Sequence, residues 1–275
     1  MMSKQKNNFL QEMAFSSMKR LEKNKANQSE EALLKACEEI KRKPFVEFQS
    51  GFLFITEIKK SSPSLGEISK PEFNLFEQAE AYVNSGSNII SVLTEPSKFT
   101  GSLQDLKDIS KRFSETPTMR KDFLIEPYQV SEAFLNGAGG VLLILAMLSD
   151  RMLKMMIDRA IKHEMFVLLE AFDEVDMQRA KTIITAFSQH SSNILLGVNC
   201  RDLRTLDVNF SRFENLSSLI PEDVVCIAES GITGASEIEV LSNLGYSGAL
   251  IGTALMQSET PDQLLKEMMA ASSKK

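Results

Sequence analysis

The sequence predicts a (β/α)8, or TIM, barrel with an N-terminal helical extension, and three observations support that prediction. Short runs rich in β-branched and aliphatic residues recur at intervals of about 24–36 residues, the spacing of βα units. Helical stretches lie between them, and eight such units fill about 220 residues. No glycine-rich turn follows the first run, as a doubly wound sheet would require. We expect one domain, with residues 1–48 as the extension and residues 49–275 as the barrel.

The extension is predicted to contain two helices. Helical spacing relates Leu10, Met13, either Ser17 or Met18, and Leu21, with lysine and glutamate between them. Asn27 or Ser29 is a suitable cap for the second helix, because a short polar side chain there can accept from free backbone N–H groups. The pattern is amphipathic, so we expect the extension to pack against the barrel.

The barrel elements follow in order along the chain. The predicted strands are residues 52–58, 88–93, 118–120, 141–145, 166–170, 194–199, 224–229 and 249–251. The predicted helices include residues 73–85, 129–137, 152–163, 174–188 and 235–244. Gly86, Gly137 and Gly245 stand at helix ends, where glycine readily adopts the left-handed conformation that stops a helix. His163 ends another helix and is expected at the surface.

Composition excludes several classes of protein. The 275 residues carry 31 basic and 37 acidic side chains, a net charge of 31 − 37 = −6, which argues against non-specific nucleic-acid binding. The 3 cysteines and 2 histidines are scattered, which argues against a disulfide scaffold and against a zinc or histidine-rich metal site. We find no export signal, and the longest apolar run, residues 141–148, is far short of the roughly 20 residues that span a bilayer. We therefore expect a cytoplasmic protein without a membrane partner.

Charged side chains stand at the carboxyl ends of the predicted strands, where a barrel of this kind places its active site. Glu57 and Lys59 close the first strand, and both should point inward because side chains alternate along a strand. Lys121, Glu170 and Glu229 end the third, fifth and seventh strands. Such charges facing one cavity must pair or take part in chemistry, because burying them unpaired is costly. Close lysine–glutamate neighbours also shift each other's pKa, which suits acid–base catalysis.

The last two strand ends predict a phosphate site. The pairs Ser230-Gly231 and Gly252-Thr253 place small residues where a helix is expected to open. Small side chains let backbone N–H groups approach a ligand, and helix N-termini attract anions. The loops after strands seven and eight commonly bind phosphate in this fold. Simple turns would explain either pair alone, but the two together favour a phosphorylated small molecule as the substrate.

Six motifs, taken in order from about residue 52 to residue 261, resemble the indole-3-glycerol phosphate synthase family. They are EIKKSSPSLG at residues 57–66, ISVLTE at 90–95 with Phe99 and Gly101-Ser102, RKDF at 120–123, PYQ at 127–129, GVNCRDL at 197–203 and AESGI at 228–232. The helical extension also fits, because that family carries extra N-terminal helices over the barrel mouth.

The resemblance implies a reaction in tryptophan biosynthesis. The substrate would be 1-(2-carboxyphenylamino)-1-deoxyribulose 5-phosphate, whose ring closes with loss of carbon dioxide and water to give indole-3-glycerol phosphate. No metal or organic cofactor is implied. We expect a monomer, which is common in that family, or a weak homodimer supported by the helical extension.

Catalytic roles are implied residue by residue. Lys121 matches the lysine that acts as general acid in ring closure, and Glu170 matches the glutamate that acts as base in dehydration. Lys59 matches a lysine that contacts the phosphate and protonates the departing hydroxyl, although the division of acid steps between the two lysines stays open. Glu57 and Glu229 match glutamates that hold the lysines and the substrate hydroxyls.

Other matched residues would bind the substrate. Asn199 and Arg201 would orient it, with Arg201 and Ser62 suited to its carboxylate because a guanidinium fork fits that group. Cys200 stands between them, where the family more usually has a polar residue. The remaining matches are Ser230, Gly231, Gly252 and Thr253 for the phosphate, with Phe99 and Phe123 either as walls for the aromatic ring or as ordinary core.

Two other classes of function remain open at this point. One is another phosphate-binding barrel enzyme: an isomerase of the same pathway would use a Cys/Asp or Asp/Asp pair, and a Schiff-base aldolase would use Lys121 or Lys59 as an amine. The second is a non-catalytic interaction protein that kept the barrel. The complete set of charged and amide residues at the strand ends argues against this last class.

Overall fold

The predicted barrel is present in the computed structural model, which describes residues 9–40, 48, 51–63, 66–68, 73–203 and 205–272. Eight parallel strands close in the order β1-β10-β9-β8-β7-β6-β5-β4. They are β1 Leu53–Ile58, β4 Ile89–Leu93, β5 Thr118–Lys121, β6 Gly140–Ile144, β7 Phe166–Ala171, β8 Ile194–Asn199, β9 Cys226–Glu229 and β10 Gly248–Ile251. Each predicted strand is confirmed, with ends that differ by at most a few residues.

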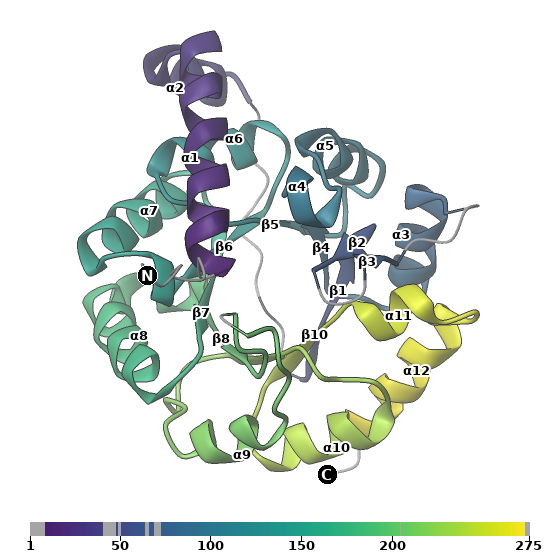
Figure 1. The fold of residues 1–275 in the computed structure, drawn as a ribbon. Coiled ribbons are helices and arrows are strands. Elements are labelled where there is room, and N and C mark those ends of the chain that lie inside the picture. Colours follow the sequence, from purple (N-terminus) through teal and green to yellow (C-terminus); the bar gives the residue numbers. More distant parts are fainter. Residues whose placement is uncertain are drawn as a thin grey trace, which may run out of the picture.

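Helices surround the barrel as a ring (Figure 1). They are α3 Leu75–Asn84, α5 Leu103–Arg112, α6 Pro127–Leu135, α7 Asp150–Lys162, α8 Glu174–Ala186, α9 Ser211–Ser217, α10 Ala235–Asn243, α11 Thr253–Gln257 and α12 Pro261–Ser272. Shorter elements lie in the connections: the antiparallel pair β2 Ser61–Ser62 and β3 Gly66–Glu67, the helix α4 Pro96–Phe99, and the 3-10 turns η1 Leu145–Met147 and η2 Ser188–Asn193. Residues 64 and 65 of the first motif lie outside the described residues.

Alternation along the strands divides the core into two layers. In β1, Ile55 points into the barrel with Ile89, Leu168 and Ile227, whereas Phe54 points outward to the helices. The inward face of β1 therefore continues to Glu57, two residues beyond Ile55, as the alternation predicts. The strand pattern thus delivers polar side chains to one end of an otherwise apolar barrel.

The extension forms α1 Phe9–Asn27 and α2 Glu30–Glu38. Met13, Ser17 and Leu21 are the buried residues of α1, at the helical spacing expected. Ser29 caps α2, because its hydroxyl accepts from the backbone N–H of Ala32 at 3.2 Å. In Figure 1, α1 lies over the edge of the barrel opening, and α2 packs against α6.

The prediction for His163 was wrong. The side chain is buried rather than at the surface. Its ring stacks on Phe134 with centroids 4.5 Å apart, and Nε2 lies 2.9 Å from the hydroxyl of Ser131. The helix-end pattern that suggested exposure did not reveal that α6 covers this end of α7.

Among the described residues, no helix has both the length and the apolar character needed to cross a bilayer.

Candidate active site

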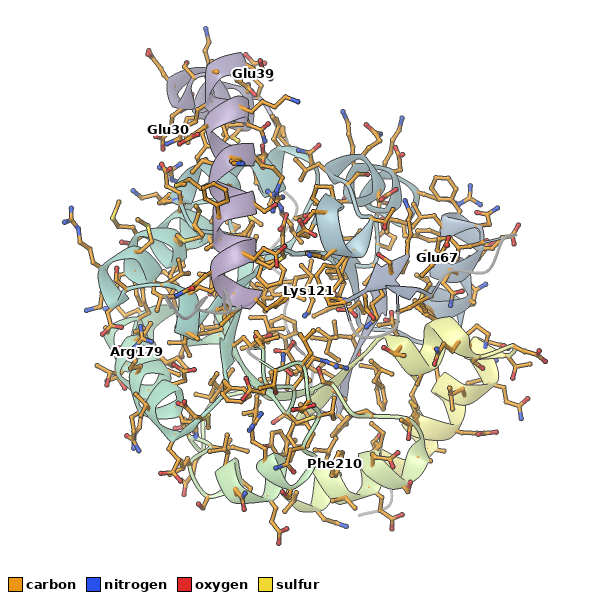
Figure 2. The ribbon with its side chains drawn as sticks, in the orientation of Figure 1. Glu30, Glu39, Glu67, Lys121, Arg179 and Phe210 are labelled. Atoms are coloured by element: carbon orange, nitrogen blue, oxygen red, sulfur yellow. The ribbon has the colours of Figure 1, made fainter. Side chains whose placement is uncertain are left out.

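All of the predicted site residues line one cavity of about 840 Å³ at the carboxyl ends of the strands. Figure 2 shows Lys121 near the centre of the barrel opening. The lining includes Glu57, Lys59, Ser62, Phe99, Lys121, Phe123, Glu170, Asn199, Arg201, Glu229, Ser230, Gly231, Gly252 and Thr253. Strands that are far apart in the sequence therefore bring their last residues to a common space.

Glu57 joins the two lysines. Its Oε1 lies 2.8 Å from Nζ of Lys59, and its Oε2 lies 3.6 Å from Nζ of Lys121. Burial raises the pKa of the Glu57 carboxyl, but the ammonium groups of Lys59 and Lys121 outweigh that effect, so the pKa is lowered overall. Glu57 is therefore an anionic anchor for both lysines.

Lys121 lies between two carboxylates without a short contact to either. Nζ is 3.6 Å from Oε2 of Glu57 and 3.7 Å from Oε2 of Glu229, and 16% of its side chain is exposed. Burial lowers the pKa of Lys121, but the negative charges of Glu57, Glu229 and Glu170 raise it by more. Lys121 is thus held as an ammonium group with its N–H groups directed into a charged cavity.

Glu170 and Glu229 form an acidic pair beside Lys121. Burial raises the pKa of both carboxyls, and the charge of Glu170 raises that of Glu229 further. Lys121 and the amide of Asn199 partly oppose the shift at Glu170, and Nδ2 of Asn199 donates to Oε2 of Glu170 at 3.2 Å. Two buried carboxylates this close retain a proton more readily than either would alone. Burial and mutual repulsion therefore make this pair hold a proton more readily than an ordinary glutamate does.

Two glycines make room for these carboxylates. A Cβ on Gly197 would lie 2.2 Å from Oε1 of Glu229, and a Cβ on Gly252 would lie 2.4 Å from Oε1 of Glu57. Gly197 was noted only as part of a motif, and its role as the space for Glu229 needed the fold. Sequence spacing carries no signal for a contact between β8 and the end of β9.

The predicted phosphate loops lie side by side after β9 and β10. Gly252 is the N-cap of α11, which begins at Thr253 as expected. The expectation for Ser230 and Gly231 was wrong in one respect, because the next helix begins only at Ala235. Both residues instead adopt φ values of 70°, in the left-handed region. This backbone conformation is costly for a serine, and it changes the direction of the chain at the barrel mouth.

Aromatic side chains wall the opposite part of the cavity. The rings of Phe99, at the end of α4, and Phe123, after β5, have centroids 6.1 Å apart. Phe9, the first residue of α1, contacts Phe123 edge-on at 5.7 Å and also lines the cavity. Sequence reasoning missed Phe9, because it precedes the helical pattern that was recognised in the extension.

Ser62 and Arg201 reach the cavity from β2 and from the segment after β8. Ser62 is buried. Arg201 is half-buried, and one of its guanidinium nitrogens, Nη1, donates to the carbonyl oxygen of Leu206 at 2.9 Å. That contact holds the Arg201 side chain along the cavity wall.

Cys200 does not face the cavity. It is buried in the outer layer between strands and helices, and burial raises the pKa of its thiol to about 11. It is therefore a protonated core residue between Asn199 and Arg201.

Known proteins resemble this chain over most of its length. A family model described as indole-3-glycerol phosphate synthase matches residues 3–268. The indole-3-glycerol phosphate synthase of Ruminiclostridium cellulolyticum is 44% identical over 214 residues, 78% of each chain. Those of Lacticaseibacillus casei and Endomicrobium trichonymphae are 39% and 38% identical, covering 79% and 90% of this chain and 80% and 93% of theirs.

Solved structures with much lower identity share the barrel. The 3-hexulose-6-phosphate synthase of Salmonella typhimurium superposes with a TM-score of 0.62 at 11% identity, over 80% of this chain and 98% of that one. KGPDC from Streptococcus mutans gives the same TM-score at 9% identity, over 82% and 99%. At such identities the likeness shows the fold alone.

Proposed function

The chain belongs to the indole-3-glycerol phosphate synthase family, and from that premise we propose how the side chains at its barrel mouth carry out the reaction. It is a carboxy-lyase of tryptophan biosynthesis. In the reaction, the ring carbon that carries the carboxylate of 1-(2-carboxyphenylamino)-1-deoxyribulose 5-phosphate bonds to the ketone carbon. Carbon dioxide and then water leave, and indole-3-glycerol phosphate remains.

Lys121 acts as the general acid of ring closure. As the new carbon–carbon bond forms, negative charge develops on the ketone oxygen, and an ammonium group can give that oxygen a proton. Lys121 suits this step better than Lys59, because Lys59 is held by Glu57 at 2.8 Å while the contacts of Lys121 are 3.6 and 3.7 Å. Because these contacts are longer, the N–H groups of Lys121 remain available to donate to the substrate. This arrangement is the observation on which the proposal rests.

Glu170 acts as the base of dehydration, and Lys59 protonates the departing hydroxyl. After carbon dioxide has left, loss of water needs one proton removed from the methylene carbon beside the ring nitrogen and one added to the hydroxyl. Burial raises the pKa of Glu170, which strengthens it as a base, and Asn199 orients its carboxylate. Glu57 holds both lysines in place, and Glu57 and Glu229 together keep Lys121 charged.

Binding of the substrate divides between the two sides of the mouth. We place the phosphate on the backbone of Ser230, Gly231, Gly252 and Thr253 and the aromatic ring between Phe99 and Phe123. Ser62 and Arg201 are suited to the carboxylate that leaves. Strand β5, which precedes Phe123, and strand β9, which precedes Ser230, are on opposite sides of the closed ring, so these groups can hold the two ends of an extended substrate.

A Schiff-base aldolase is disfavoured by the same electrostatics. Its lysine must lose a proton to act as an amine nucleophile, which requires a lowered pKa. The carboxylates of Glu57, Glu229 and Glu170 raise the pKa of Lys121 instead. The site therefore favours an acid over a nucleophile at this position.

The test is replacement of Lys121. We expect Lys121→Ala to remove ring closure, with a loss of at least about 100-fold, because a general acid typically contributes ~10²–10⁴-fold. Indole fluorescence would report the product, and the absence of tryptophan from the chain keeps the background low.

Lys60→Ala is the matched control, because Lys60 pairs with Asp105 at 2.8 Å and does not line the cavity. It should retain activity close to that of the unmodified protein. Full activity in a folded Lys121→Ala variant would contradict the proposed role.

Location in the cytoplasm, a monomer or weak homodimer, and a single domain formed by residues 1–48 and 49–275 stay predictions.

A further inference from the structure

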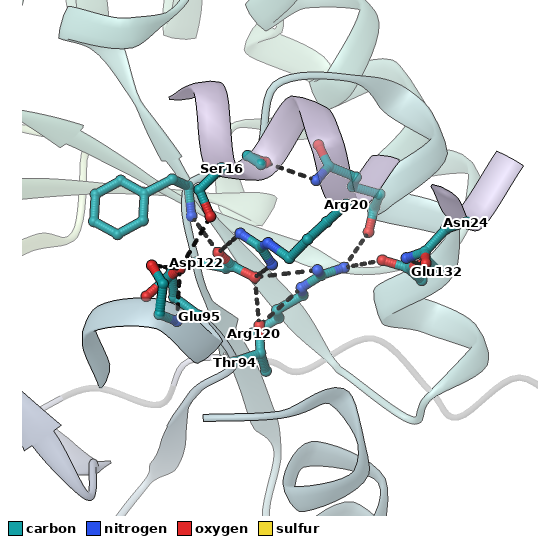
Figure 3. A network of polar contacts seen from close by, with 12 residues as sticks. Ser16, Arg20, Asn24, Thr94, Glu95, Arg120, Asp122 and Glu132 are labelled. Carbon is teal, nitrogen blue, oxygen red and sulfur yellow. Dashed lines mark hydrogen bonds and ion pairs between the residues drawn. The ribbon is translucent and has the colours of Figure 1, made fainter. Parts of the chain in front are cut away.

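One face of α1 carries three polar side chains that reach toward the aromatic wall of the cavity. Glu12, Ser16 and Arg20 are spaced by four residues, so they lie in a row along the helix. None of them was assigned a role from the sequence. Figure 3 shows Ser16 and Arg20 pointing from α1 toward the ends of the neighbouring strands.

Arg20 is bound to the residue between Lys121 and Phe123. Its Nη1 and Nη2 donate to the two carboxylate oxygens of Asp122 at 2.7 and 2.8 Å. Asp122 is fully buried, and the same carboxylate accepts from the backbone N–H of Phe123 at 2.8 Å. The orientation of Phe123 is thus connected to α1 through a bidentate ion pair.

Phe99, the other aromatic residue of the cavity wall, is connected to α1 through α4. The Ser16 hydroxyl donates to Oε1 of Glu95 at 3.3 Å, and Glu95 caps α4 by accepting from the backbone of Ser97 and Lys98. Lys98 also pairs with Glu12 of α1 at 2.8 Å. Phe99, the next residue, is the last of α4.

We propose that the Glu12–Ser16–Arg20 face of α1 is a clamp that sets the separation and tilt of Phe99 and Phe123, and that Arg20 is its principal positioning residue. The clamp would select for the aromatic half of the substrate, so this inference rests on the proposed function. Phe9, on the same helix, packs edge-on against Phe123 and completes the aromatic wall of the cavity.

The strand order keeps the clamp apart from the proposed phosphate loops. β5, which ends beside Asp122, and β9, which precedes Ser230, are four places apart in the closed ring of eight strands. A disturbance of the clamp should therefore weaken binding of the aromatic ring and leave binding of phosphate unchanged.

The test uses Arg20→Met in the full chain, with Lys25→Met as the matched control. Asp122 keeps Arg120 at 3.2 Å and Thr94 at 2.7 Å, so its charge stays partnered in Arg20→Met. Lys25 lies on the same helix and makes an ion pair with Glu126, so it is not part of the contacts that connect α1 to Phe99 and Phe123. Steady-state kinetics give kcat and KM for the substrate, and inorganic phosphate serves as a competitive inhibitor.

We expect Arg20→Met to raise KM about tenfold, equivalent to about 1.4 kcal/mol, while kcat and the inhibition constant of phosphate stay within about twofold. Lys25→Met should change none of these values. Arg20→Lys, which keeps the charge but loses the fork, should give an intermediate KM.

An unchanged KM in Arg20→Met would overturn the proposed clamp. So would a loss of affinity for phosphate as large as the loss of affinity for the substrate. If Arg20→Met does not fold, Arg20→Lys and Ser16→Ala are judged by the same two measurements. Failure of the unmodified protein to form indole-3-glycerol phosphate would reject the proposed function itself. Normal turnover of the unmodified protein together with an unchanged KM in Arg20→Met would reject only this inference.

Discussion

Glu57 and Glu229 lie on either side of Lys121, yet their pKa values are shifted in opposite directions. Burial raises the pKa of each. Glu57 has two ammonium neighbours, which outweigh burial and lower its pKa. Glu229 has Glu170 beside it, and neither of its buried oxygens makes a hydrogen bond within the described residues. Identical side chains thus acquire opposite pKa shifts through their surroundings alone.

This contrast gives a prediction for stability. A carboxyl whose folded pKa is raised above the ordinary 4.5 contributes stability that is present at low pH and is lost as pH rises through the folded value. Glutamine cannot titrate, so Glu229→Gln should gain stability relative to the unmodified protein between pH 5 and pH 8. Activity should fall by about tenfold or more. Urea unfolding at the two pH values measures the difference.

Glu57→Gln is the control of opposite sign. The pKa of Glu57 is lowered, so its contribution is present above the ordinary value and is lost as pH falls. Both pH 5 and pH 8 lie above the ordinary value of 4.5, so the stability cost of Glu57→Gln should be nearly the same at these two values and should shrink only at lower pH. The same pH trend in both variants would contradict the assigned electrostatics.

A glycine in β8, Gly197, and a glycine directly after β10, Gly252, each lie against a carboxylate that belongs to a neighbouring strand. In a parallel barrel, the last residues of adjacent strands share one level, and a side chain as long as glutamate reaches over the next strand. The register pairs Gly197 with Ile227 and Asn199 with Glu229, so the Glu229 carboxylate passes over Gly197. The absence of a Cβ on one strand therefore positions an acid carried by another.

We predict that Gly197→Ala lowers kcat by about tenfold or more and destabilises the fold by ~1–3 kcal/mol, the usual cost of overpacking. The added Cβ would lie 2.2 Å from Oε1 of Glu229 and must displace it. Gly139→Ala is the matched control, because its Cβ would meet nothing closer than 3.6 Å. Steady-state assays and thermal unfolding of both variants check this. Equal behaviour of the two would contradict it.

Across the whole molecule, the extension shares both layers of the barrel's core. Met13 belongs to the cluster inside and above the barrel, while Leu21, Leu33 and Cys37 belong to the outer cluster between strands and helices. Ion pairs join the same parts, with Arg159 of α7 held to Glu30 of α2 at 2.9 Å. Because apolar burial supplies most of the folding free energy, parts that share a core should unfold together.

We therefore expect a single unfolding transition for the full chain. Far-ultraviolet circular dichroism, which follows all helices, and near-ultraviolet signals of Tyr82, Tyr128 and Tyr246 in the barrel should give the same midpoint. An earlier helical transition, separate from the tyrosine signals, would mean that the extension is an independent unit.

Periodicity was sufficient for the eight barrel strands, for the two helices of the extension, for the five barrel helices named from the sequence and for most of the cavity lining. Alternation along residues 52–58 predicted that Glu57 faces inward, and the strand-end rule brought Lys121, Glu170 and Glu229 to the same mouth. These inferences depend only on neighbours two to four residues apart and on the closure of the barrel. The burial of His163 and the β2–β3 pair were missed, because both depend on which helix or loop covers a segment.

The sequence by itself determined the barrel, its extension and the residue types available at the mouth, because backbone periodicity and the common direction of parallel strands are local properties. Only the tertiary structure decided which charge faces which. Arg20 and Asp122 are 102 residues apart in the chain, and the opposite pKa shifts of Glu57 and Glu229 depend on distances among side chains from separate strands. Electrostatic interaction falls with separation in space, and separation in space is set by folding.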